Sequence, residues 1–404
     1  MRGFISRYAN WIVAAAVGLL IAFLFVYAPP AKAADLGGNC CADLEERIAE
    51  LEGTVVRKGN RKVSLVLSGA INKALFYHDA DDFGLGSDTS VIENGAAESY
   101  LSISGAGQIR PGLWAGYNLE IVQGQTGIGI SPGFIGVTTD NDLYTRQSYA
   151  FIKSDDLGAL SVGLQSMATD DLSQQSVART WISSKRLTWQ PIGGLLITAP
   201  GIDLNVPLEP FNGKKANSVK YTSRTIEGFV ASAAWNSEDD SWDASLRYAG
   251  KGGGLEYVAA VGYYDDKNND IAESVGSLVA IPDIESKTLS ANAGVKHTAS
   301  GLFAQGTWAR LEVDLPALLG GASFETDSYH VQVGIETKFF AVGQSTLFGE
   351  YSDWSDLGLK FYGAGFNQSL TEGVDAYVLA RRYELDVGAG GNIDTVLGGI
   401  RVGF

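Results

Sequence analysis

Hydrophobic and polar residues alternate along much of the chain, and the last ten residues show this pattern clearly. From Thr395 to Phe404, one set of alternate positions is apolar or glycine, and the other set includes Arg401. Successive side chains on a β-strand point to opposite faces, so the segment is predicted to be a strand with two different faces. A soluble sheet also contains such strands, and the number of repeats therefore decides the fold class.

The alternation recurs between turn-forming residues throughout residues 62–404. From Tyr329 to Phe339, for example, one face is apolar and the other includes Glu336 and Lys338. Burying such charges in the dry core of a sandwich costs several kcal/mol per ion, whereas a water-filled lumen removes that cost. Counting the segments gives about 16 strands, a size at which a closed barrel encloses an aqueous channel. The predicted fold is therefore all-β, an antiparallel transmembrane barrel with lipid outside and water inside.

The connections between these segments also alternate in length, which is typical of bacterial outer-membrane barrels with short periplasmic turns and long external loops. One connection, residues 166–214, is much longer than the rest and contains four prolines without sustained alternation. A stretch of this length is usually functional or disordered. We predict that it folds into the lumen and narrows the pore. Aromatic residues near strand ends, including Tyr383, are expected to form interfacial girdles. The pattern leaves the facing of Arg381 and Arg382 unassigned.

The amino terminus does not share the strand pattern. Residues 1–33 read as a secretory signal peptide, with a basic start, a long apolar run and the cleavage motif Ala31-Lys32-Ala33. A retained membrane helix is the alternative. Residues 34–61 then form a predicted periplasmic segment with a short helix at 42–57. Its apolar residues follow a coiled-coil spacing, which fits either a helix bundle on an oligomer axis or a single helix that lies on the barrel rim or plugs the barrel.

The neighbouring Cys40 and Cys41 cannot easily bridge each other. In an oxidising periplasm they either bridge subunits or remain free thiols.

Composition supports the barrel and excludes several functions. The 404 residues have a mean hydropathy of +0.04, which is too polar for a helical membrane protein. The net charge of −16 argues against nucleic-acid binding. Removal of the signal peptide takes away three basic residues, so the mature charge is 27 − 46 = −19, which favours cations if the acids lie in the lumen.

Residues that would support catalysis or metal binding are sparse. The three histidines, His78, His297 and His330, are widely separated and show no metal-ligand spacing. Neither a nucleophile elbow nor a phosphate-binding or dinucleotide motif occurs in a suitable context. We therefore predict no enzyme activity, no metal and no cofactor.

Several segments together resemble a known family. The strand pairs around the long connection are similar to those that flank the constriction loop of general trimeric porins, and the residues before the barrel resemble alphaproteobacterial porins with a short N-terminal helix. The segments that carry this resemblance are Cys40 to Glu46, Arg57 to Lys62, Thr145 to Lys153, Ser161 to Gln165, Asn217 to Tyr221, Phe229 to Trp235 and the terminal Phe404.

The resemblance implies a homotrimeric, 16-stranded outer-membrane porin whose third external loop enters the lumen. Its partners would be outer-membrane lipid, lipopolysaccharide, small hydrophilic solutes and ions, and Phe404 would be the signal read by the barrel assembly machinery. Basic residues of the wall would face acids of the loop across a constriction. By position the basic residues are Arg146, expected to face inward with Ser148 and Ala150, followed by Lys214 and Lys220, and the loop acids are Asp170, Asp171, Asp203 and Glu209. The short loop motif of the family is absent.

The predicted function is therefore passive diffusion of ions and small hydrophilic solutes through a water-filled channel. One alternative is a structural anchor that grips the periplasmic layer through the helix at 42–57. A barrel enzyme is the other alternative.

Overall fold

A computed structural model gives the arrangement of the barrel. It describes residues 63–83, 86–123, 126–131, 134–139, 142–184, 195–199, 202–206, 213–238, 240–267, 285–314, 321, 323–354, 358–386 and 390–404. The predicted signal peptide, the helix at 42–57, Cys40 and Cys41 lie outside these residues. Among the described residues, no helix combines the length and the apolar character needed to cross a bilayer.

The predicted closed antiparallel barrel is confirmed. Within the described chain, each wall strand pairs with the next, and β1 pairs with β21 to close a ring of sixteen strands. The wall strands are β1 (Val66–Asp79), β3 (Tyr100–Arg110), β4 (Leu113–Gln123), β7 (Leu143–Ser154), β8 (Gly158–Ser166), β11 (Lys215–Thr222), β12 (Phe229–Asn236), β13 (Ser241–Gly252), β14 (Leu255–Asp266), β15 (Glu285–His297), β16 (Leu302–Asp314), β17 (Ser323–Thr337), β18 (Ser345–Trp354), β19 (Leu359–Thr371), β20 (Val374–Leu385) and β21 (Gly391–Gly403).

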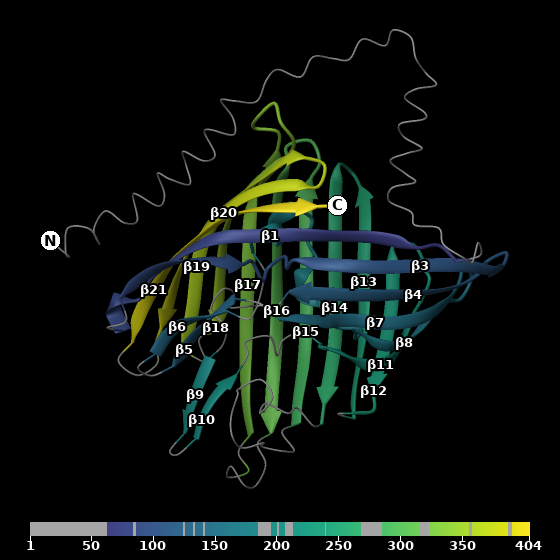
Figure 1. Cartoon of the computed structure of the whole chain (residues 1–404), viewed down its shortest axis with the longest axis horizontal. Helices are drawn as coiled ribbons and strands as arrows, with labels where there is room; N and C mark the ends of the chain where they lie inside the picture. The colour runs from purple at the N-terminus through teal and green to yellow at the C-terminus, as the bar shows by residue number, and fades with distance from the viewer. Residues whose placement is uncertain are drawn as a thin grey trace.

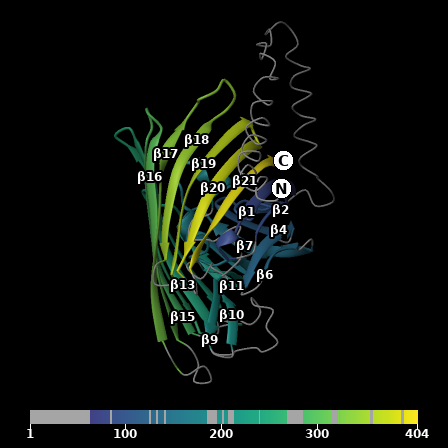
Figure 2. The same ribbon diagram turned by 90° about the vertical axis from the view of Figure 1, so that its left-hand side faces the viewer.

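The two sides of the barrel cross each other. In Figure 1, β1, β3, β4 and β7 pass in front of β13 to β17 at a steep angle, as expected when tilted strands close into a cylinder. Figure 2 places β16 and β17 on one side and β1, β2 and β4 on the other. The strand β2 (Ser87–Glu93) and the hairpins β5 (Thr126–Ser131)–β6 (Phe134–Thr139) and β9 (Leu195–Ala199)–β10 (Ile202–Val206) complete the described strands.

The alternation predicted from the sequence separates an outer face from an inner face. On β8, Leu160 and Val162 point outward and are 52% and 57% exposed, whereas Ser161 and Gln165 are buried inside. Outward aliphatic side chains of this kind recur on strand after strand, which suits contact with lipid.

The pair of arginines that the sequence left unassigned divides between these faces. Arg381 is buried inside the barrel, and Arg382 points outward, where it pairs with Asp394 across β20 and β21 at 2.6 Å. Tyr383 shares the inner face with Arg381 and is fully buried, so its predicted place in an outer girdle is wrong.

The wall contains one interruption. Both β2 and β3 pair with β1, with β2 along residues 73–79 and β3 along residues 66–70, so they are two parts of one interrupted barrel strand. The residues between them, 94–99, leave the sheet. The short helical turns η1 (Asp81–Phe83), η2 (Leu172–Gln174) and η3 (Arg179–Ile182) lie outside the wall strands, and the last two belong to the long connection after β8.

The interior of the barrel is unevenly filled. Val177, Ala178 and Ile182 of the long connection pack against inward residues of the wall, including Phe348 and Leu379, in one buried apolar cluster. We call the inner faces of β13 to β21 the packed side of the lumen. The inner faces of β3, β4, β7, β8 and β11 do not contribute to this cluster, and we call them the open side.

Candidate functional site

The long connection starts and returns at the same point of the wall. The backbone N–H of Met167 donates to the carbonyl of Lys214 at 3.0 Å, which joins the end of β8 to the start of β11. Asp243 on β13 then holds the first residues of the loop, because its carboxylate accepts from the N–H groups of Ala168 (3.0 Å) and Thr169 (2.6 Å) and from the Thr169 hydroxyl (2.7 Å). Hydrogen bonds to a charged acceptor are the stronger kind, so the base of the loop is firmly tied.

Further along, the loop crosses the packed side strand by strand. The carbonyl of Ser173 accepts from Asn292 on β15 at 3.0 Å, and the N–H of Val177 donates to Gln305 on β16 at 3.1 Å. The guanidinium of Arg179 pairs with Asp375 on β20 at 2.7 Å. These contacts satisfy polar groups of both the loop and the inner wall, which explains how inward polar residues are accommodated beside an apolar cluster.

A buried ion pair fixes the far end of the described loop segment. Arg381 on β20 donates to Glu350 on β18 at 2.6 Å, and both side chains are almost completely buried. The Ser184 hydroxyl donates to Glu350 at 2.6 Å and accepts from Arg381 at 2.9 Å. Residues 167–184 are thus attached to the wall along their whole length.

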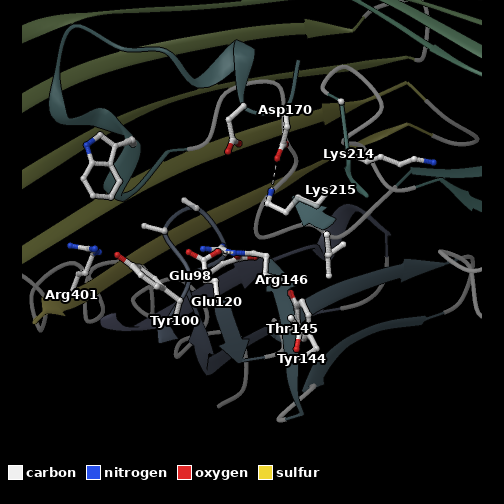
Figure 3. Close-up of a pocket in the computed structure, with 17 residues that line it drawn as sticks. Glu98, Tyr100, Glu120, Tyr144, Thr145, Arg146, Asp170, Lys214, Lys215 and Arg401 are labelled. Atoms are coloured by element: carbon white, nitrogen blue, oxygen red, sulfur yellow. Dashed lines mark hydrogen bonds and ion pairs between the residues drawn. The ribbon is translucent and has the colours of Figure 1, made fainter. Parts of the chain in front are cut away.

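On its other side, the loop faces a cavity of about 680 Å³. Residues of the open side, among them Glu120 and Arg146, supply much of the opposite lining, and Arg401 of β21 adds to it (Figure 3). Eight charged side chains line this cavity, four acidic and four basic, and they are Glu98, Glu120, Asp170, Asp171, Arg146, Lys214, Lys215 and Arg401. Tyr100, Tyr144 and Trp181 add aromatic surface.

Arg146 reaches this cavity because β7 is irregular. The register between β4 and β7 shifts at Glu120, so that both Arg146 and Gln147 reach the Glu120 carboxylate, at 2.6 and 3.2 Å. Such a bulge re-aims a side chain. Ser148 and Ala150 do not share this inward direction, because Ala150 pairs with the outward Val162 and regular alternation places Ser148 on that same face.

The predicted wall bases and loop acids take part in several ion pairs. Arg146 forms ion pairs with Glu120 on the wall strand β4 and with Glu98 in the segment between β2 and β3. The loop acid Asp170 pairs with Lys215 at 2.8 Å. Lys214 pairs instead with a wall acid, Asp266 on β14, at 3.0 Å. In Figure 3 the Asp170–Lys215 pair lies across the pocket from the cluster around Arg146.

The remaining predicted residues are dispersed. Lys220 on β11 donates to the carbonyl of Ser166 at 2.6 Å and is absent from the cavity lining. Asp203 belongs to β10, and Glu209 lies outside the described residues. Phe404 pairs through its backbone with Gly69, next to the seam between β21 and β1.

Four of the charged lining residues were not predicted from the sequence, namely Glu98, Glu120, Lys215 and Arg401. Arg401 had a usable signal, because it occupies the polar face of the terminal strand. Glu120 stands among apolar residues, and only the register with β7 gives it a role. In the described chain, no group of three or more His, Cys, Asp or Glu side chains is arranged to hold a metal ion.

Comparison with known proteins gives matches to outer-membrane barrels, which agrees with the observed fold. A protein-family model described as Gram-negative porin matches residues 15–388 of the sequence. Among solved structures, OmpT of Vibrio cholerae, an outer-membrane protein, is 13% identical with a TM-score of 0.56, covering 86% of this chain and 99% of its own. OmpF of Salmonella typhi, in complex with daunomycin, is 14% identical with a TM-score of 0.53, covering 87% and 100%.

The outer-membrane channel DcaP of Acinetobacter baumannii is 13% identical with a TM-score of 0.52, covering 86% and 99%. At these identities the likeness establishes the fold. No protein with a curated functional description matches the sequence.

Proposed function

Since this chain belongs to the Gram-negative porin family, and is therefore an outer-membrane barrel that forms a passive diffusion channel, we propose that the cavity between the loop and the open side is its narrowest passage. The observation that carries the proposal is the lining. Eight charged groups of both signs surround a space of about 680 Å³ inside a closed wall. Ions and small hydrophilic solutes cross such a lining by exchanging water for fixed polar groups.

The passage is set by Arg146, Lys214, Lys215 and Arg401 among the bases and by Glu98, Glu120, Asp170 and Asp171 among the acids. Lys220 supports the base of the loop, and Asp203 and Glu209 remain predicted contributors. Diffusion requires no bond to form or break, so we assign no catalytic residue. The active form is a homotrimer embedded in lipid and lipopolysaccharide. A trimer form described for OmpT of Vibrio cholerae supports this assembly, and light scattering in detergent tests it.

Planar-bilayer recording tests the passage itself. The purified protein gives stepwise, ohmic conductance, and Trp181→Ala raises the conductance because this side chain lines the cavity. The matched control is Trp235→Ala on the outer face, where the side chain is 51% exposed, and it leaves the conductance unchanged. Silence of the folded wild-type protein at every voltage overturns the channel, and equal effects of the two variants overturn the proposed passage.

A further inference from the structure

The interruption between β2 and β3 places six residues where the sheet needs only two. Lys73 pairs with Glu93 and Ala70 pairs with Tyr100, so residues 94–99 stand opposite Ile71 and Asn72 alone. The four extra residues cannot remain in the ladder. They leave the wall beside the narrowest passage, and Gly95 to Glu98 all line the cavity.

A buried polar network gives this segment a defined fold. Asn72 donates from its backbone to Ser99 Oγ at 2.8 Å and from its side chain to the carbonyl of Ala97 at 2.7 Å. Ser99 in turn donates its N–H to Glu93 at 2.7 Å, and the Tyr377 hydroxyl donates to Asn72 at 2.6 Å. Asn72, Glu93 and Ser99 are all at most 2% exposed. Buried polar groups that find their partners specify one conformation.

The segment is also joined to the long loop. The Asn94 side chain donates to the carbonyl of Ile182 at 2.9 Å and accepts from the N–H of Ala96 at 2.9 Å. The first contact connects the segment to η3, and the second closes a tight turn that starts the segment. The loop and the segment therefore meet at one edge of the passage.

The segment brings a carboxylate to the open side. Glu98 pairs with Arg146, which also pairs with Glu120 at 2.6 Å, so the two carboxylates share one guanidinium. Figure 3 shows the three side chains together at the lining, with Tyr100 close by. On the long loop, by contrast, the carboxylate of Asp170 does not share the Arg146 guanidinium but pairs with the ammonium of Lys215 at 2.8 Å.

We propose that residues 94–99 form a second constriction element, and that Glu98 is a selectivity residue that favours small cations over anions. This inference rests on the proposed passage and assigns to it a determinant outside the long loop. The segment narrows the passage by its volume, and the Glu98 carboxylate raises the local concentration of cations.

The charge is tested by Glu98→Gln, which keeps the shape of the side chain. In a planar bilayer under a potassium chloride gradient, the reversal potential is expected to report a two- to threefold lower ratio of cation to anion permeability, an order-of-magnitude value for losing one charge a few ångströms from the ion path in water. Glu384→Gln is the matched control, because Glu384 is exposed on the outer face. The control leaves the ratio unchanged.

The narrowing of the passage by the volume of the segment is tested by deleting residues 95–98. The deletion would leave Asn94 opposite Asn72 and Ser99 opposite Ile71, so β2 and β3 run on as one strand with every side chain on its present face. Conductance then rises. Ala96→Trp makes the opposite test without altering the backbone and lowers the conductance, which keeps the test decisive if the deletion variant does not fold.

The outcomes separate this inference from the proposed passage. A silent wild-type protein overturns the channel. A conducting wild-type protein with a normal response to Trp181→Ala, but with Glu98→Gln and Ala96→Trp both indistinguishable from wild type, overturns the second constriction element alone.

Discussion

The two sides of the lumen are built from strands of the same alternating type but have different interiors. On the packed side, residues 167–184 cover the wall and bury large side chains such as Phe348, which is 2% exposed. On the open side, the inner wall presents charged residues such as Arg146 to a cavity. The difference shows that strand alternation separates inside from outside, whereas the path of one loop decides which inner surface remains available to water.

The interactions of the two sides should therefore serve different purposes. Contacts on the packed side hold the loop, and their loss is expected to reduce stability first. Contacts on the open side lie along the proposed passage, and their loss is expected to alter the current while the barrel remains stable. Three sets of variants examine this division.

The largest effect is expected from Arg381→Met on the packed side. The change leaves the Glu350 carboxylate buried without its cation, and breaking a buried pair in this way costs about 3–5 kcal/mol. It also removes a donor to Ser184, so the loop end loosens and the single-channel current becomes noisier. Urea unfolding from lipid vesicles measures the stability. The double variant Glu350→Gln with Arg381→Met should regain much of the loss, and a double variant as unstable as the single one would contradict this explanation.

A loss of stability of comparable size is expected from Phe348→Ala. Truncating a buried phenylalanine leaves a cavity and typically costs at least about 3 kcal/mol. Tyr144→Ala removes an aromatic ring from the open side, where Tyr144 is 42% exposed, and exposed substitutions change stability by about 0.5 kcal/mol. Unfolding of both variants under the same conditions compares the two sides directly. Equal losses would show that the division between them is wrong.

A clear effect on current, with a smaller loss of stability than in the packed-side variants, is expected from Arg146→Gln. Removing this positive charge leaves Glu98 and Glu120 facing the passage, so the ratio of cation to anion permeability rises about two- to threefold. Arg382→Gln is the control on the outer face. Its exposed pair with Asp394 contributes only about 0–1 kcal/mol and lies away from the passage. A shift of Arg146→Gln toward anions would contradict the assignment.

The sequence was sufficient to predict the architecture, because lipid and water on opposite faces impose a period of two on every strand. The inner and outer residues of the terminal strand followed from that constraint, whereas the inward path seen for residues 167–184 was expected from the length of the connection and its lack of alternation. Arg381 and Arg382 could not be assigned from the pattern, since each fits either face until the neighbouring strand is known.

The details of the passage were less accessible from sequence. Residues 94–99 are small or polar, and in sequence they cannot be distinguished from an ordinary turn. Their position opposite two residues of β1 appears only in the register. Arg146 was identified by resemblance, but its direction depends on a bulge and its partners lie on strands that the sequence does not align.

The pairing of β21 with β1 has a consequence for how the molecule is made. This seam joins the two ends of the described barrel, from Asp79 with Asp394 to Ala70 with Gly403, and the backbone pair of Gly69 with Phe404 extends it. Until the seam forms, β1 and β21 are unpaired edges that can recruit another chain. A ring closure that spans so much of the sequence is entropically slow. Protection against aggregation therefore arrives late in biogenesis, when the first and last strands meet.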